Sequence, residues 1–370
     1  MKFLIDKDVF QKEITNAVKF TSSQLSSLPS LQGVFIELVN KSFTLKSTNL
    51  NDFYQTTLPT ESSDSFKAIF DAKKVLEFLN VLPQGKITIS LKPSGLLILS
   101  PSLQGEFNLF QLDDYPAFPE TDSQEEVVLT EEMVSTLPLV LFSSSRDDAR
   151  PVLTGVLIES KDEVARFVTT DGFRLSVSNF TTDNANNWSF IASSRFLQEL
   201  IVLYKGKELH LKYSKENKVF ISKFGNTRLI SRTIEGDFPP YQKVIPDKST
   251  TNITLDVLKL SKNIKAVSIF ARDQSNIIIL DIQKNLLTIK PKGQKGESSY
   301  ATQEIVSFDG EPIKIAFNYR FILDFLNIIP FEKITVGLTT SVSPVVFKED
   351  SGDPNYLHII MPLRTEEIEG

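Results

Sequence analysis

The chain has 370 residues, of which 41% are hydrophobic and 23% are charged. This length and composition suit two or three domains with substantial cores. The net charge of −6 argues mildly against a simple basic nucleic-acid binder, although an acidic body can still carry a basic patch. The absence of cysteine excludes disulfides, thiol catalysis and cysteine-ligated zinc or iron–sulfur sites.

The first residues show no pattern typical of export. Lys2, Asp6 and Lys7 interrupt the apolar N-terminal residues too early for the core of a signal peptide. The sequence contains no run of about 18 apolar residues, so no membrane-spanning helix is expected. We therefore expect a soluble cytoplasmic protein that does not bind membranes.

A strand followed by a capped helix opens the chain and recurs twice. Residues 1–4 predict a short strand, and Asp6 is a suitable N-cap for the helix that follows. Thr130 and Asp256 occupy the corresponding places, 124 and 250 residues later. In the second copy, Pro138 is expected to cut or kink the helix.

The first helix has an apolar face and a basic face. Its apolar face consists of Phe10, Ile14 and Val18. Lys12 and Lys19 are expected to point away from the core, and Lys262 is the counterpart of Lys12 in the third copy.

Short β-branched and aromatic runs follow these helices. Residues 33–37 (GVFIE) and 155–159 (GVLIE) differ at one position in five, and the third copy has 277–281 (IIILD). Polar turns separate them from further strand-like runs. These patterns predict several antiparallel strands in each copy.

A second helical pattern recurs at residues 70–82, 191–200 and 317–329. The first and third copies carry polar residues at the same places of the outer face, namely Lys73, Glu77 and Asn80, and Arg320, Asp324 and Asn327. The second copy has Ser194 and Gln198 there, and Arg195 lies one position along.

Self-similarity at a nearly fixed period predicts tandem structural repeats. Each repeat has two helices and several strands, which predicts an α+β unit with helices packed on antiparallel sheets. Acidic joints containing serine or threonine place the three domains at residues 1–123, 124–248 and 249–370.

Residues that most often carry catalysis are scarce. The only histidines are His210 and His358, both in strand-like runs. Residues 293–296 (GQKG) lack the spacing of a phosphate-binding loop. No carboxylate pair marks an acid–base or two-metal site. We therefore expect no catalytic residue, no metal site and no cofactor.

Five segments carry a family resemblance. They are MKF at 1–3, RPVLTG at 150–155, TDGFRL at 170–175, EGDFPPY at 235–241 and IIMPLR at 359–364. In this order, on a threefold repeat, they resemble the bacterial DNA sliding clamps, the β subunits of DNA polymerase III, over the whole chain.

The resemblance implies a head-to-tail homodimer that closes six clamp domains into a ring, with helices lining the hole and sheets forming the outer wall. A heterologous contact that closes produces such a ring. One side of the contact would lie near Phe107 and Leu109, and the other near Ile269 and Phe270.

The resemblance also implies a nucleoid-associated, non-catalytic processivity subunit that encircles double-stranded DNA without reading its sequence. Cations facing phosphates give diffuse, salt-dependent attraction, whereas base contacts would create stops. The topology of the ring retains the DNA, so an acidic exterior suits this role. The expected DNA-facing cations are Lys12, Lys19, Lys73, Lys74, Arg146, Arg195, Lys259, Lys262 and Arg320.

Clamps of this family bind short peptides, often Gln-Leu followed by hydrophobic residues, in a pocket between the second and third domains. The implied partners are the replicative polymerase, the clamp loader and repair factors. Aliphatic residues and methionine suit an adaptable floor, and arginine and threonine suit orienting contacts. The corresponding residues are Leu153, Thr170, Gly172, Phe173, Arg174, Leu175, Pro239, Lys243, Val244, Val342, Ser343, Ile360, Met361, Pro362, Leu363 and Arg364.

The sequence departs from the family pattern in four places. Phe173 stands where the family usually has histidine, and Lys243 where arginine is frequent, so a more apolar pocket rim and an altered peptide preference are expected. Ser22-Ser23-Gln24 replaces a loop in which a DNA-contacting arginine is common. The acidic residues 365–370 are expected near the pocket mouth, where they would tune access.

Two other interpretations stay open. One is an enzyme built on repeated α+β domains, such as a metal-dependent hydrolase, against which the missing histidines, thiols and phosphate loops count. The other is a clamp-like adaptor that never encircles DNA, which the few cations of the second domain keep open. A sizing column separates adaptor from clamp, because a strict monomer cannot close a ring.

Overall fold

The computed structural model describes residues 2–22, 28–120, 126–182, 187–206, 209–272, 275–293, 299–350 and 355–366. The chain forms two compact units. Unit 1 comprises Met1–Glu131 and Glu199–Thr233, and unit 2 comprises Glu132–Gln198 and Ile234–Gly370. Among the described helices, none has the length and apolar character needed to cross a membrane.

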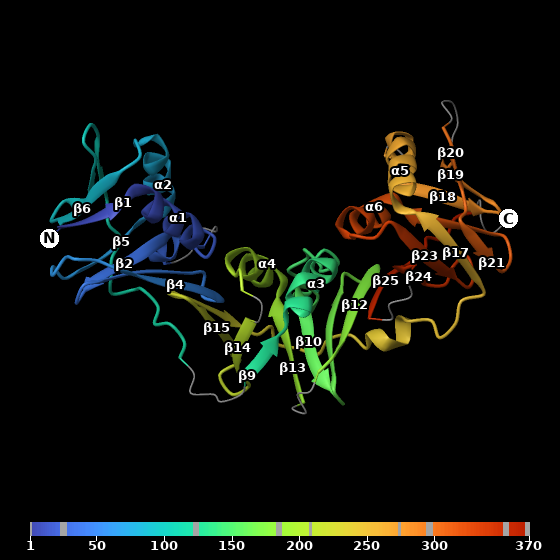
Figure 1. Cartoon of the computed structure of the whole chain (residues 1–370), viewed down its shortest axis with the longest axis horizontal. Helices are drawn as coiled ribbons and strands as arrows, with labels where there is room; N and C mark the ends of the chain where they lie inside the picture. The colour runs from blue at the N-terminus through green and yellow to red at the C-terminus, as the bar shows by residue number, and fades with distance from the viewer. Residues whose placement is uncertain are drawn as a thin grey trace. The chain divides into compact units, whose positions relative to one another are not determined.

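Unit 1 contains two antiparallel sheets and two helices (Figure 1). Its helical segments are α1 (Lys7–Val18), α2 (Ala72–Val81) and the 3-10 turn η1 (Pro29–Gln32). Its strands are β1 (Lys2–Asp6), β2 (Gly33–Val39), β3 (Ser42–Thr48), β4 (Asp52–Pro59), β5 (Phe66–Asp71), β6 (Lys86–Lys92), β7 (Gly95–Leu99), β8 (Gln104–Phe107), β9 (Glu126–Leu129), β14 (Leu209–Ser214), β15 (Val219–Phe224) and β16 (Thr227–Arg232). The sheet orders are β1-β6-β7-β8 and β5-β2-β3-β4-β16-β15-β14-β9.

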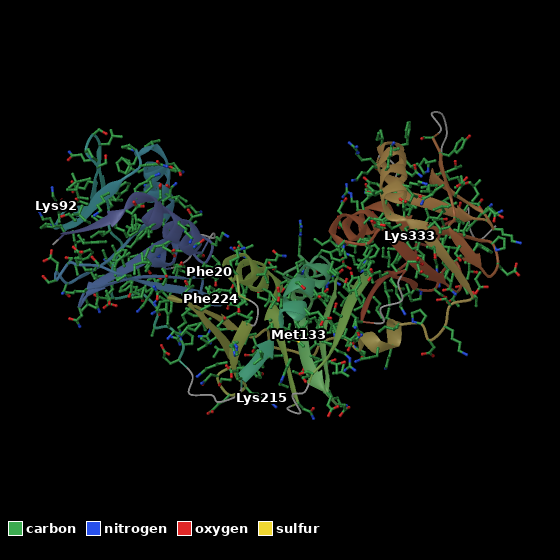
Figure 2. All side chains as sticks on the ribbon, viewed as in Figure 1. Phe20, Lys92, Met133, Lys215, Phe224 and Lys333 are labelled. Carbon is green, nitrogen blue, oxygen red and sulfur yellow. The ribbon has the colours of Figure 1, made fainter. Side chains whose placement is uncertain are left out.

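Aspartates begin both helices of unit 1. Asp6 accepts hydrogen bonds from the backbone N–H groups of the first turn of α1, as predicted, and Asp71 does the same for α2. Apolar faces then hold the helices on the sheets, through Phe10, Ile14 and Ala17 of α1 and Val75 and Leu79 of α2, all buried. After α1, the ring of Phe20, which Figure 2 labels, stacks on Tyr54 with 5.5 Å between centroids.

Unit 2 repeats this plan with more strands. Its helical segments are α3 (Glu131–Leu141, apart from its first residue), α5 (Val257–Ala271), α6 (Tyr319–Ile328), η2 (Pro151–Thr154) and η3 (Tyr241–Val244), and α4 (Ser194–Leu203) contributes to both units. Its strands are β10 (Gly155–Lys161), β11 (Val164–Thr170), β12 (Arg174–Thr181), β13 (Trp188–Ser193), β17 (Thr251–Asp256), β18 (Ile277–Ile282), β19 (Leu286–Pro291), β20 (Ala301–Glu304), β21 (Ser307–Asp309), β22 (Ile313–Asn318), β23 (Lys333–Leu338), β24 (Val345–Glu349) and β25 (Tyr356–Ile360). The sheet orders are β20-β19-β18-β22 and β13-β10-β11-β12-β25-β24-β23-β17-β21.

One strand pair in each unit makes the long sheet continuous. In unit 1, β4 pairs with β16, and in unit 2, β12 pairs with β25. Strand β4 belongs to the first predicted domain, β16 and β12 belong to the central one, and β25 belongs to the third. The predicted central domain is therefore divided between the two compact units. The α+β class with helices on antiparallel sheets is confirmed, and the domain boundaries stay a prediction.

The helix α3 does not end where the sequence predicts. It runs through Pro138 to Leu141, so of the expected cut or kink at this proline, the cut is wrong and the kink stays a prediction. Leu137, Val140 and Leu141 are buried. We attribute the continuation to this packing, which compensates for the hydrogen bond that proline cannot donate.

Candidate functional site

An apolar cavity of about 350 Å³ lies in unit 2, beside the turn that joins β11 to β12. Its described lining consists of Leu153, Thr170, Gly172, Phe173, Arg174, Leu175, Pro239, Pro240, Tyr241, Lys243, Val244, Ile359 and Met361. The structure therefore gathers ten of the sixteen predicted peptide-binding residues around one cavity. Their role in binding peptides stays a prediction.

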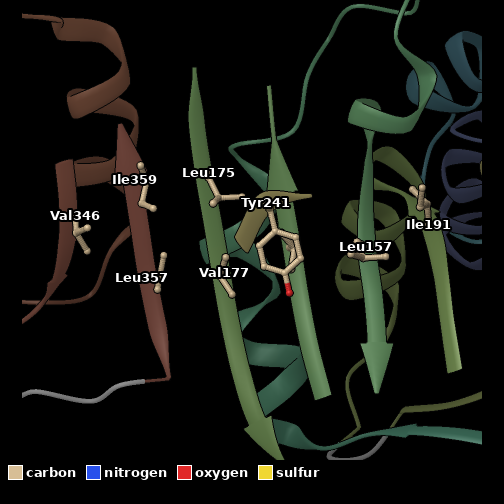
Figure 3. Packing of buried hydrophobic residues seen from close by; sticks show 9 residues of the cluster. Leu157, Leu175, Val177, Ile191, Tyr241, Val346, Leu357 and Ile359 are labelled. Carbon is tan, nitrogen blue, oxygen red and sulfur yellow. The ribbon is translucent and has the colours of Figure 1, made fainter. Parts of the chain in front are cut away.

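The floor of the cavity comes from strand pairing. Leu175 of β12 lies directly opposite Ile359 of β25, so both side chains point to the same face of the sheet. Tyr241 of η3 packs on that face with them (Figure 3). Its hydroxyl donates to Glu159 Oε1 at 2.8 Å, which fastens the segment after Pro239 to the sheet. Burial raises the pKa of Tyr241 well above its ordinary value, so it stays a hydrogen-bond donor.

A tight turn forms one rim of the cavity. Asp171 Oδ1 accepts the N–H groups of Phe173 and Arg174 at 2.9 and 3.0 Å. Gly172 has a φ of +94°, a left-handed conformation that favours glycine. Thr170 Oγ1 donates to the carbonyl of Arg174 at 2.6 Å. Backbone and side-chain bonds thus fix the shape of this rim before any ligand arrives.

The side chain of Arg174 points from the turn toward α6. Its Nε donates to Asp171 Oδ2 at 3.0 Å and its Nη1 to Asp324 Oδ2 at 2.7 Å. The guanidinium lies over the rings of Phe142 and Phe321, 5.4 and 5.0 Å from their centroids. This arginine is therefore held in place by two carboxylates and two rings.

His358 lies in the core behind this arginine. It is fully buried, its Nδ1 is 2.9 Å from Ser176 Oγ, and its ring stacks on Phe325 at 4.8 Å. Burial, followed by the positive charge of Arg174, holds the pKa of His358 well below its usual value. The imidazole is therefore neutral at pH 7 and acts as a packed aromatic ring.

Six predicted pocket residues lie outside this lining, namely Val342, Ser343, Ile360, Pro362, Leu363 and Arg364. Ile360 is the clearest difference. It lies opposite Arg174 in the β12–β25 register, and because successive residues of a strand face opposite sides of the sheet, it faces away from the side on which Leu175 and Ile359 lie. Val342 and Ser343 belong to the turn between β23 and β24.

Sequence reasoning missed three lining residues, Pro240, Tyr241 and Ile359. Pro240 and Tyr241 belong to the EGDFPPY segment, so the segment was found but its contact residues were not. The alternation along β25 allowed either Ile359 or Ile360 to face the cavity. Only the pairing of Leu175 with Ile359 decides between them.

Eight of the nine predicted DNA-facing cations are exposed, namely Lys12, Lys73, Lys74, Arg146, Arg195, Lys259, Lys262 and Arg320. Lys19, which was predicted to point away from the core, is the ninth. It is half-buried, and its Nζ lies 2.7 Å from Glu199 Oε2. Lys19 directly follows α1, and its side chain, which is 31% exposed, reaches Glu199 of α4.

Six of the eight exposed cations sit on two packed helix pairs, whereas Arg146 lies in a loop and Arg195 on α4. In unit 1, α1 and α2 pack together, and Gln11 Nε2 donates to Asn80 Oδ1 at 2.6 Å between them. In unit 2, α5 and α6 pack together, and Asp256 caps α5 as predicted, accepting the N–H of Lys259 at 2.8 Å. Each pair turns apolar residues to its sheets, which leaves the lysines and arginines on the outer side.

The four predicted dimer-contact residues lie near sheet edges or on an exposed helix face. Phe107 ends the edge strand β8 and packs on Phe78 at 5.5 Å, and Leu109 is exposed just beyond. Ile269 of α5 is 59% exposed, and Phe270 is half-buried. Strand β20 forms one edge of the small sheet of unit 2. Their role in dimer formation stays a prediction.

Two departures from the family pattern fall largely outside the described residues. Of Ser22-Ser23-Gln24, only Ser22 is described, and it is half-buried. Of the acidic tail, Thr365 is buried and Glu366 is exposed. The expectation that the tail tunes the pocket stays a prediction.

Three family models match the chain in consecutive segments. They are described as DNA polymerase III beta subunit, N-terminal domain over residues 1–119, central domain over residues 128–240, and C-terminal domain over residues 242–364. These matches confirm the family resemblance that the sequence motifs indicated.

A relative named beta sliding clamp from Synechocystis sp. is 27% identical, and the match covers 96% of this chain and 98% of the relative. Another beta sliding clamp, from Halalkalibacterium halodurans, is 26% identical, and the match covers 99% of this chain and all of the relative. The structure of the DNA polymerase III beta subunit of Thermotoga maritima matches with a TM-score of 0.91 at 23% identity, covering 98% and 99% of the two chains. A Pseudomonas aeruginosa sliding clamp bound to griselimycin matches with a TM-score of 0.89 at 20% identity, covering 99% and 100%. At these identities, the structural matches confirm the fold.

Proposed function

The chain belongs to the DNA polymerase III beta subunit family, and on this premise we propose that it is a DNA sliding clamp. In this role it is a ring-shaped, non-catalytic processivity factor that encircles duplex DNA and tethers the replicative polymerase. The observation that carries the proposal is the match of all three family domains, in order, from residue 1 to residue 364. Relatives named beta sliding clamp, aligned over nearly the whole chain, support it.

The exposed cations supply the attraction to DNA. Lys12, Lys73 and Lys74 of unit 1 extend from helices by flexible stems, as do Lys259 and Lys262 of unit 2. Flexible ammonium groups follow phosphates without recognising bases, so the energy changes little as the ring moves. Lys19 contributes less than these residues, because Glu199 already neutralises it.

Two copies close the ring through sheet edges that have no neighbour among the described strands. Strand β8, with Phe107 and Leu109, meets β20 of a second copy, beside Ile269 on α5. An edge strand offers unpaired backbone donors and acceptors, and exposed apolar side chains beside it favour a specific contact. The contact is heterologous, as ring closure requires.

Partners bind through short hydrophobic peptides in the cavity beside the β11–β12 turn. These partners are the replicative polymerase, the clamp loader and repair factors. A cavity of about 350 Å³ takes a few side chains rather than a folded domain. The griselimycin complex of the Pseudomonas aeruginosa clamp supports ligand binding by proteins of this fold.

Retention on DNA tests the proposal. Clamps loaded on nicked circular DNA are expected to stay bound through gel filtration and to be lost when the circle is linearised, because they slide off the ends. Equal retention on circular and linear DNA would contradict encirclement. Light scattering should give twice the 41.6 kDa of one chain. A strict monomer would favour an adaptor that never encloses DNA.

The salt dependence of DNA binding tests the cations. The triple variant Lys12→Ala, Lys73→Ala, Lys74→Ala should reduce the slope of log K against log salt by about 0.9 for each phosphate contact removed. The matched control replaces three exposed hairpin lysines, Lys41, Lys161 and Lys284, by alanine. Equal slopes for the two triple variants would show that these helix faces do not contact DNA.

A further inference from the structure

A groove of about 700 Å³ lies in unit 1, and side chains from four adjacent strands, β4, β16, β15 and β14, line most of it. The strand register turns the lysine and arginine side chains of its described lining to one side of the sheet. Lys212 lies opposite Ile221, and Lys223, two residues further along β15, lies opposite Arg228. We call this surface, defined by Lys212, Lys223 and Arg228, the basic groove.

The positive charge of the basic groove is only partly balanced. Lys223 and Arg228 lie directly opposite each other, and like charges in that arrangement destabilise a strand pair. Glu126 lies opposite Lys212, but its Oε1 is 3.1 Å from His210 Nδ1 instead. Within the described part of the chain, neither lysine forms an ion pair with a carboxylate, and both are exposed. Two ammonium groups are therefore available to a ligand.

The chain itself shows how an acidic segment binds to this surface. Phe118 packs on the buried cluster of the sheet, with its ring 5.0 Å from that of Phe53. Two residues later, both oxygens of Glu120 accept hydrogen bonds from Arg228, at 2.7 and 2.6 Å. Arg228 Nη2 also donates to the carbonyl of Pro119 at 3.1 Å. These hydrogen bonds hold the pKa of Glu120 below its usual value, so the groove already holds one ionised carboxylate.

We propose that the basic groove is a docking site for an acidic, extended segment of a partner protein that carries carboxylates at alternate positions. Lys212 and Lys223 are diagonal neighbours on adjacent strands, which places them about 7–8 Å apart. In an extended peptide, residues i and i+2 lie on the same side, about 6.8 Å apart. A Glu-x-Glu segment therefore presents one carboxylate to each lysine, beside the carboxylate that Glu120 presents to Arg228.

The test uses the full-length protein and two fluorescent peptides of equal composition at low salt. Ser-Ser-Glu-Ser-Glu-Ser-Ser places both carboxylates on one side of an extended chain, whereas Ser-Ser-Glu-Glu-Ser-Ser-Ser places them on opposite sides. The first should bind about two- to fivefold more tightly by fluorescence anisotropy, because it forms one more exposed ion pair. Equal affinities, or no binding of either peptide, would overturn the proposal. Neither result would affect the proposed clamp function, which does not depend on this groove.

Paired variants assign the binding to the basic groove. Lys212→Ala combined with Lys223→Ala should weaken the alternating peptide by about two- to tenfold and should abolish the difference between the two peptides. The matched control combines Lys161→Ala with Lys284→Ala, which removes the same charge at exposed positions outside the groove and should change neither affinity. Equal losses in the two double variants would overturn the assignment, because they would show that only net charge matters.

A third variant should strengthen binding. Glu120→Gln removes the carboxylate that occupies Arg228, so a third cation becomes available, and the alternating peptide should bind about two- to fivefold more tightly. An unchanged or lower affinity would contradict the place of Arg228 in the site. Labelled oligothymidine tests the class of the occupant. Tighter binding of this single strand than of the peptide, lost in the Lys212→Ala and Lys223→Ala variant, would overturn the choice of a protein segment.

Discussion

Replacing Asp171 by alanine should destabilise unit 2 far more than replacing Asp147. Both aspartates accept a hydrogen bond from an arginine Nε three residues later, at 3.0 Å, and both accept a backbone N–H. They differ in burial. The side chains of Arg174 and Asp171 are 10% and 15% exposed, whereas those of Arg150 and Asp147 are 49% and 48% exposed. The chain therefore contains its own matched control.

The magnitude follows from the bonds that are lost. Asp171→Ala removes two backbone hydrogen bonds and one charge-assisted bond, and it leaves Arg174 with Asp324 as its remaining carboxylate partner. Removing one partner of a buried pair costs roughly 3–5 kcal/mol, and the contact with Asp324 reduces this to about 2–4 kcal/mol. Asp147→Ala should leave the stability unchanged, because water screens and replaces the exposed bonds.

The single tryptophan supplies the assay. Trp188 lies in β13 of unit 2, so its fluorescence during urea unfolding reports on this unit. Asp171→Ala should shift the midpoint to clearly lower urea, and Asp147→Ala should overlay the unaltered protein. Equal shifts for the two variants would refute the idea that burial decides the contribution of this Asp-Arg pair.

Two further predictions concern pH and charge. The pKa of His358 is depressed in the folded state, mainly by burial, whereas the unfolded chain titrates near pH 6.5, so the unfolded state binds the proton first. The free energy of unfolding should be constant above about pH 6.5 and fall below it by up to about 1.4 kcal/mol per pH unit. His358→Gln should remove this part of the slope, and His210→Gln, at an exposed position, should retain it. Parallel urea-midpoint profiles against pH for the two variants would contradict the assignment to His358. Lys243→Ala should weaken binding of a synthetic Gln-Leu-Asp-Leu-Leu peptide by about two- to fivefold at low salt, as expected for an exposed ion pair with the peptide's aspartate. Lys248→Ala, which replaces an exposed lysine outside the cavity lining, should not weaken it. A loss for Lys243→Ala that persists undiminished at high salt in calorimetry would exclude this charge effect.

The sequence predicted the fold class well because the information is local and repeated. Asp6 and Asp256 cap helices where expected, and of the predicted apolar face of α1, Phe10 and Ile14 are buried and Val18 is half-buried. Three copies of one pattern made each assignment more secure than a single copy would. Pro138 shows the limit of local rules. Tertiary burial of Leu137 and Val140 outweighs an intrinsic preference against proline in a helix.

The candidate site was only partly predictable, because strand register and charge pairing are not local. Ile360 was chosen over Ile359, and only the pairing across β12 and β25 determines which of them meets Leu175. Lys19 was predicted to point away from the core, but nothing in the sequence indicated that Glu199, 180 residues away, is its partner. Helical periodicity identifies which face a residue occupies. It does not identify which distant side chain that face will meet.

The two proposed surfaces need opposite mechanical properties, and the chain builds them from different elements. Sliding requires cations that adjust to each new phosphate, so exposed lysines on helix faces suit it, and a lysine fixed to Glu199 does not. Partner selection requires groups that stay in place, so that little order must be gained on binding. Arg174 meets this need because two carboxylates and two aromatic rings hold it, and the same bonds hold Phe173 in the rim. Loosening the rim by Asp171→Ala should therefore weaken peptide binding while leaving the salt slope of DNA binding unaltered, and a coupled loss of both would show that the two surfaces are not independent.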